Sequence, residues 1–170
     1  MAHSDEMDPG LRHGDRDQDA FCSTTTAVVV VGIDGSDTSW DAFWWACGET
    51  KRLGGRTVAV FVGPTSTAVS VAATATLTGA SAYGEIQQTM NDQAQELCRQ
   101  VRGYAREHDV ELTFVHTHGD TAKELIRIAD DDHADLIVVG RSAKARHHLA
   151  GSLGRRLVGR RDAPIIVVVP

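Results

Sequence analysis

The residues best suited to chemistry stand in a basic, glycine-containing segment near the C-terminus. Residues 141–161 hold seven of the 17 Lys and Arg residues of the chain and no carboxylate. Within this segment, Gly151 and Ser152 stand where a helix is predicted to begin. Backbone N–H groups point outward at a helix start, where the helix dipole favours an anion, and a serine hydroxyl can donate to a phosphate oxygen. The segment therefore predicts a phosphate site, and the alternative is an ordinary basic loop before a capped helix.

Asp34 is the second candidate, because it directly follows the apolar run 27–33. A carboxylate at the end of a strand can accept hydrogen bonds from ribose hydroxyls or from an adenine amine. The alternative is an aspartate that only shapes its own turn. Neither a GxxxxGK[ST] phosphate loop nor a GxGxxG sequence after a strand is present in the chain.

The remaining reactive side chains predict less. His116 and His118 lie on one face of a predicted strand, but no third metal ligand accompanies them. Cys22, Cys47 and Cys98 form no CxxC pair, so they indicate neither a zinc site nor a redox pair. No nucleophile elbow with Ser, His and Asp partners is present either.

The elements that must position these residues alternate between strand and helix. Apolar, β-branched runs predict strands at 27–33, 57–62, 110–115, 136–139 and 164–169. Apolar residues at helical spacing predict helices at 38–53, 85–108, 121–132 and 152–161. Residues 63–84 carry no charge and are rich in Ala, Thr and Ser, so we predict a mobile loop or lid there.

Uniformly apolar strands that alternate with helices are typical of a parallel α/β sheet with helices on both faces. We therefore predict one domain over residues 27–170, with ligands at the carboxyl ends of its strands. Residues 1–26 are acidic and poor in apolar side chains. They predict a disordered N-terminal tail, and the alternative is a regulatory or partner-binding arm.

Composition excludes several classes of protein. The net charge of −6 argues against general binding to nucleic acid. The longest strongly apolar runs are about five residues, too short to cross a membrane. The acidic N-terminus does not resemble a secretory signal, so we expect a cytoplasmic protein.

Several separated segments resemble the universal stress protein family. They are 30–36 (VVGIDGS), 119–121 leading into Leu125 and Ile126, 135–140 (DLIVVG), 151–152 and 163–169 (APIIVVV). The resemblance covers residues 27–170 in the correct order. It implies a five-stranded parallel sheet of the Rossmann-like, adenine nucleotide alpha hydrolase-like type. It also implies a homodimer, often paired through the last strand, which is Ile165–Val169 here.

One branch of that family binds ATP through a loop of the form Gly-x2-Gly-x9-Gly-[Ser/Thr], and another branch binds none. In this chain Gly140 matches the first glycine, and Gly151 and Ser152 match the final pair. Asp34 matches the acidic residue near the ribose and adenine, and the backbone N–H of Leu153 could also reach phosphate. The positions that line the adenine correspond to Ile33, Val62 and Val139.

The loop departs from that form in two ways. Ala143 replaces the second glycine, and seven residues rather than nine separate it from Gly151. The cationic side chains of Arg141, Lys144 and Arg146 could compensate through charge. The resemblance thus implies a nucleotide sensor that binds ATP, with or without Mg²⁺, and acts on an unknown protein partner. The alternatives are a nucleotide-free dimeric scaffold and a slow ATPase, although no clear general base is present.

Overall fold

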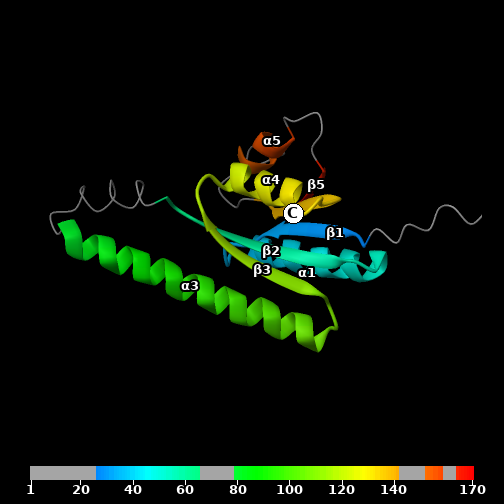
Figure 1. Cartoon of the computed structure of the whole chain (residues 1–170), viewed down its shortest axis with the longest axis horizontal. Helices are drawn as coiled ribbons and strands as arrows, with labels where there is room; N and C mark the ends of the chain where they lie inside the picture. The colour runs from blue at the N-terminus through cyan, green and yellow to red at the C-terminus, as the bar shows by residue number, and fades with distance from the viewer. Residues whose placement is uncertain (1–25, 66–78, 142–151, 159–163) are drawn as a thin grey trace, which may run out of the picture.

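The computed structural model of the chain describes residues 26–65, 79–141, 152–158 and 164–170 (Figure 1). Predictions that fall elsewhere, including those for the tail 1–25, lie outside the described residues. Strands and helices alternate along the chain. They are β1 (Val28–Gly32), α1 (Asp37–Leu53), β2 (Arg56–Gly63), α3 (Gly79–Glu107), β3 (Leu112–His118), α4 (Thr121–Asp131), β4 (Leu136–Gly140), α5 (Ser152–Leu157) and β5 (Ile165–Val169).

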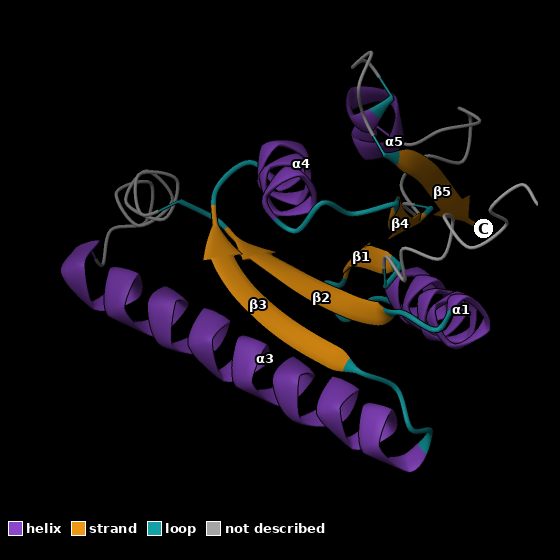
Figure 2. Cartoon of the chain, turned by 45° about the vertical axis from the view of Figure 1, so that its right-hand side comes forward, coloured by secondary structure: helices purple, strands orange, loops and turns teal. Residues whose placement is uncertain are grey.

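The strands form one sheet in the order β3-β2-β1-β4-β5, and every neighbouring pair is parallel. Helices α1 and α3 cover one face of this sheet, and α4 and α5 cover the other (Figure 2). The predicted five-stranded parallel α/β fold is therefore confirmed. None of the helices in the described ranges is long and apolar enough to cross a membrane.

The valine run of β1 explains why this strand lies at the centre of the sheet. Val29 and Val31 pack with Phe43 in the core on the α1 and α3 face. Val28 and Val30 pack with residues of α4 in the core on the opposite face. Because successive side chains of a strand point to opposite faces, a continuous apolar run fits a strand that is buried on both.

Helix α1 is fixed at both ends by the residues that the sequence indicated. Ser36 is the N-cap, and its hydroxyl accepts a hydrogen bond from the backbone N–H of Ser39 at 3.3 Å. Gly54 ends the helix in the left-handed conformation, with φ of 65°. Glycine reaches this conformation without a steric penalty, which is why it commonly follows a helix.

Several predicted boundaries are wrong, among them the end of the last helix, since α5 ends at Leu157 rather than at residue 161. Helix α3 begins at Gly79 rather than residue 85, so the end of the predicted loop 63–84 is helical, and Gly63 belongs to β2. Alanine favours a helix even where no charged residue accompanies it, so the lack of charge in this segment does not indicate a loop. Strand β3 runs from Leu112 to His118 rather than over 110–115, because an edge strand half exposed to solvent accepts the polar residues at its end.

Candidate functional site

The direction of the chain across the sheet reverses between β1 and β4. From β1 the chain passes through α1 to β2 on one side, and β4 lies on the other side of β1. The helices that follow β1 and β4 pack on opposite faces, the arrangement in which a crevice forms between two strand ends of a doubly wound sheet. Ligands of such sheets bind at this topological switch point. The carboxyl ends of β1 and β4 are therefore the candidate site.

Asp34 and Arg141 lie on the two sides of this crevice. Val31 pairs with Val138 across β1 and β4. Asp34 and Arg141 each follow three residues beyond that pair, and both are exposed. The register thus brings Asp34 and Arg141 to neighbouring strand ends.

The carboxylate of Asp34 shapes the turn that leads into α1. Its Oδ1 accepts hydrogen bonds from the backbone N–H of Ser36 at 3.0 Å and from the Ser36 hydroxyl at 2.6 Å. Between them, Gly35 adopts φ of 86°, which a residue with a side chain rarely tolerates. Within the described residues, Oδ2 of Asp34 accepts no hydrogen bond. Asp34 therefore shapes its own turn, as the alternative prediction says. Its Oδ2, which no described residue contacts by a hydrogen bond, is available to a ligand.

Asp34 carries its negative charge over a wide pH range. Partial burial acts to raise its pKa, but the hydrogen bonds from the Ser36 side chain and backbone, together with Ser39, outweigh it. The pKa of Asp34 consequently lies below its ordinary value of 3.8. At neutral pH this side chain is an acceptor only, as a partner for sugar hydroxyls should be.

Gln93 of α3 supports the Asp34 turn, a role that no pattern in the sequence indicates. Its side-chain amide donates a hydrogen bond to the backbone carbonyl of Asp34 at 3.0 Å. Leu97, one turn further along α3, lies below Gly35. A glutamine on a long helix has no distinctive spacing, so only the packing of α3 against this turn reveals the role.

Gly140 lets the start of α1 approach the end of β4. A Cβ atom placed on Gly140 would lie 2.2 Å from the carbonyl oxygen of Thr38 and 2.9 Å from the backbone nitrogen of Ser39. The next residue, Arg141, donates its backbone N–H to the carbonyl of Val169 at 2.8 Å. Gly140 therefore has a packing role, whatever it contributes to a ligand.

The predicted adenine-lining side chains do not share one face of the sheet. Ile33 is buried in the core beneath α1 and α3. Val62 and Val139 belong to the core beneath α4 and α5, and so does Leu153. Ser152 is the first residue of α5. Ala143 and Gly151 lie outside the described residues.

An ion pair ties α5 to the same edge of the sheet. The guanidinium of Arg156 donates to the carboxylate of Asp120 at 2.6 Å. Asp120 is also the N-cap of α4 and accepts from the backbone N–H of Lys123 at 3.1 Å. The hydrogen bond from Arg156, with that from Lys123, lowers the pKa of Asp120.

His116 and His118 lie together at the end of β3, with ring centroids 4.6 Å apart. Gly63 of β2 faces both rings. Within the described ranges, no group of three or more His, Cys, Asp or Glu residues could hold a metal ion. The two histidines therefore give no evidence of a metal site among the described residues.

Comparison with known proteins identifies the family of this chain. The sequence profile of the universal stress protein family matches residues 26–169. The chain belongs to the universal stress protein family. A universal stress protein of Methanocaldococcus jannaschii is 28% identical to it over 142 residues, which cover 82% of this chain and 80% of that protein.

Solved structures share the fold of this universal stress protein. UspA from Lactobacillus plantarum superposes with a TM-score of 0.67 at 18% identity, covering 85% of this chain and 97% of that one. A family protein from Arabidopsis thaliana with AMP bound gives 0.58 at 13% identity, covering 85% and 92%. At such identities the likeness establishes the architecture alone.

Proposed function

We propose that this universal stress protein binds an adenine nucleotide in the crevice between the ends of β1 and β4. The observation that carries the proposal is the position of Asp34 at the topological switch point of the sheet, with an Oδ2 that accepts no hydrogen bond from any described residue. Family membership and the AMP found in the similar Arabidopsis protein support it.

In this proposal each side of the crevice binds a different part of the nucleotide. Asp34 accepts a hydrogen bond from a ribose hydroxyl or the adenine amine, while Ser36 and Gln93 hold its turn in place. Arg141 and the basic segment that follows it attract the phosphates. Gly151 and Ser152 complete the predicted phosphate contacts at the start of α5.

We further propose ATP as the preferred nucleotide. Residues 141–161 contribute seven cationic side chains and no carboxylate. A triphosphate carries more negative charge than a monophosphate, so such a segment favours ATP over AMP through Coulomb attraction. Any Mg²⁺ would then be held mainly by the phosphates. Occupancy of this site would act as the signal to a protein partner.

Calorimetry on nucleotide-free protein tests the proposal. We expect a binding isotherm for ATP, a weaker one for AMP, and clear weakening in Asp34→Asn. The matched control is Asp37→Asn, which removes a carboxylate three residues away in the first turn of α1. If neither nucleotide binds, the chain is a nucleotide-free scaffold. If Asp37→Asn weakens binding as much as Asp34→Asn, the assigned role of Asp34 is wrong.

We also propose that two copies of this chain pair through β5. This strand is at the edge of the sheet, and the side chain of Ile165 is 68% exposed. An open strand edge with an exposed apolar residue is a template for pairing. In light scattering we expect Ile165→Lys to be monomeric. Val158→Lys, at an equally exposed position beyond α5, should remain dimeric; a wild-type monomer would overturn the proposal.

A further inference from the structure

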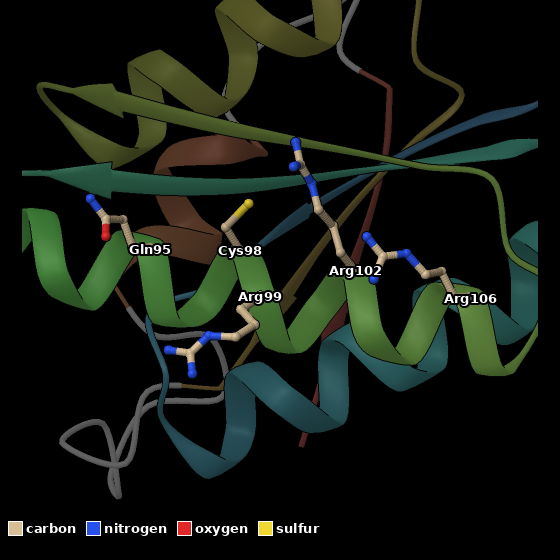
Figure 3. Close-up of a pocket in the computed structure, with 5 residues that line it drawn as sticks. All are labelled: Gln95, Cys98, Arg99, Arg102 and Arg106. Carbon is tan, nitrogen blue, oxygen red and sulfur yellow. The ribbon is translucent and has the colours of Figure 1, made fainter.

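A basic groove lies on α3, away from the crevice. It encloses about 300 Å³ and is lined by Gln95, Cys98, Arg99, Arg102 and Arg106 (Figure 3). Figure 3 shows Cys98 and Arg102 extending toward the neighbouring strands, with Arg106 beside Arg102 and Arg99 directed away. No carboxylate is among the residues that line this groove.

Two of the three guanidinium groups form no ion pair with a residue that the structure describes. Arg99 forms an ion pair with Glu96 on the same helix. Arg102 and Arg106 are exposed and form no hydrogen bond or ion pair within the described residues. An adjoining cavity shares both arginines and is also lined by Asp109 and Glu111, but neither carboxylate forms an ion pair with Arg102 or Arg106 in the described part of the chain.

The spacing of these two arginines suits an acidic segment in an extended conformation. Four residues on a helix advance by about 6 Å. Carboxylates at alternate positions of an extended chain lie on one side, about 6.6 Å apart. The sequence of this chain contains that pattern at residues 15–19 (DRDQD), where Asp15, Asp17 and Asp19 alternate with other residues.

The acidic segment is close enough in the chain to reach the groove. The carbonyl of Ala27 accepts from Arg56, and Thr57 donates to the carbonyl of Glu111. Ala27 and the start of β3 therefore lie at the same end of the sheet, two strand spacings or about 10 Å apart. Eight residue steps separate Asp19 from Ala27, and they span up to about 26 Å when extended.

We propose that residues 15–19 of this chain dock in the α3 groove, with Asp17 and Asp19 pairing with Arg102 and Arg106. The occupant is the chain's own segment, because its charge complements the groove and its attachment point is nearby. Each exposed ion pair is worth at most about 1 kcal/mol, so docking depends on the short attachment, which raises the effective concentration of the segment and gives a partly occupied groove. Occupancy should fall at high salt, because exposed ion pairs are screened.

The native cysteines of the chain supply the probe. Cys98 lines the groove, and Cys22 follows Asp19 by three residues. In the full-length protein, a short bis-maleimide should join Cys22 to Cys98, as detected by peptide mass spectrometry. The cross-link should fall by roughly threefold or more in Asp15→Asn/Asp17→Asn/Asp19→Asn and in Arg102→Gln/Arg106→Gln, as loss of the ion pairs predicts.

A matched control removes the same number of charges from residues 5–8, outside the proposed docking segment. Asp5→Asn/Glu6→Gln/Asp8→Asn should leave the yield of the cross-link unchanged. Equal loss in this control would show that only net charge matters, and it would overturn the proposal. An unchanged yield in the other two variants would overturn it as well.

Isotope labelling decides which copy supplies the segment. Mixed ¹⁵N-labelled and unlabelled protein should give cross-links within one chain only. Cross-links between labelled and unlabelled chains would assign the segment to a second copy and contradict docking within one chain. Circular dichroism on each variant should show unchanged helix content, because Arg102 and Arg106 are exposed.

Discussion

The backbone of Gly140 lies so close to the carbonyl group of Thr38 that a side chain at position 140 would clash with it. The end of β4 passes directly beneath the first turn of α1, and a Cβ atom on Gly140 would lie 2.2 Å from the Thr38 carbonyl oxygen. The residue that matches the first glycine of the family's phosphate loop therefore also fixes how the helix after β1 sits on the sheet. The proposed nucleotide site would therefore share this position with the packing of α1 on the sheet.

Gly140→Ala should destabilise the protein even without a ligand. The added methyl group meets backbone atoms that cannot rotate away, so α1 or β4 must shift at a cost of about 2–3 kcal/mol. Urea unfolding measures the loss. The control is Gly48→Ala, because a Cβ at this exposed position in α1 meets nothing within 4 Å. It should gain about 0.5–1 kcal/mol from helix propensity, and equal effects at both sites would contradict the packing role of Gly140.

Gln93→Ala should weaken adenine-nucleotide binding while leaving Asp34 itself in place. Loss of the 3.0 Å hydrogen bond to the Asp34 carbonyl loosens the turn that orients the carboxylate. We expect a reduction in affinity of roughly 3–10-fold, since one neutral hydrogen bond is worth about 1 kcal/mol. Calorimetry with ATP measures it. Gln95→Ala, two residues along the same helix, is the control, and equal weakening there would exclude a specific role for Gln93.

Much of the fold could be predicted from the sequence, because its strands are buried. Apolar runs such as 27–33 and 136–139 predict buried strands. Ser36 and Gly54 mark the ends of α1, because a serine hydroxyl caps a helix start and a glycine adopts the left-handed conformation after a helix. Helix α3 was harder to delimit. Its first residues, including Gly79 and Ala80, carry neither charge nor a clear apolar stripe, so helix propensity alone decides them.

The candidate site could be predicted only in part. Asp34 and Arg141 were found because parallel strands bring their carboxyl ends to one edge. Gln93 was missed because its role depends on how α3 packs against a turn 59 residues earlier in the chain. Sequence spacing does not encode such a contact. The division of Ile33 and Val139 between two core clusters depends on the register of β1 against β4, in which Val31 pairs with Val138.

Thr57→Val should destabilise the protein although valine favours strands. The hydroxyls of Thr50 and Thr57 are buried and 2.8 Å apart, so each satisfies the other. Removing one leaves a buried hydroxyl without this partner, which costs about 1–3 kcal/mol. The double variant Thr50→Val/Thr57→Val should recover part of that loss in urea unfolding. Additive losses in the double variant would show that the two hydroxyls do not depend on each other.

The thermal stability of the protein should fall below about pH 4.5, in part through Glu124. Hydrogen bonds from Arg127, and then from Thr117, lower the pKa of Glu124 from its ordinary value of 4.5. A carboxylate whose pKa is lower in the folded state contributes its stability above the unfolded value and loses it as pH falls through the folded one. Glu124→Gln should therefore show a shallower fall in Tm between pH 5 and pH 2. Glu107→Gln, which removes an exposed carboxylate at the end of α3, should follow the wild type.

Cys47 should be inert to thiol reagents in the folded protein, whereas Cys98 should react. Burial raises the pKa of the Cys47 thiol to about 11, although a hydrogen bond with Thr57 opposes the rise, and only 1% of the residue is exposed. At pH 8 roughly one thiol in a thousand is then ionised, and the thiolate is the reactive form. Cys98 is only partly buried and lines the α3 groove, so reagent reaches it. Maleimide labelling followed by peptide mass spectrometry should find Cys47 modified only after denaturation. If Cys47 and Cys98 are modified at similar rates in the native protein, the prediction is wrong and the core beneath α1 opens readily.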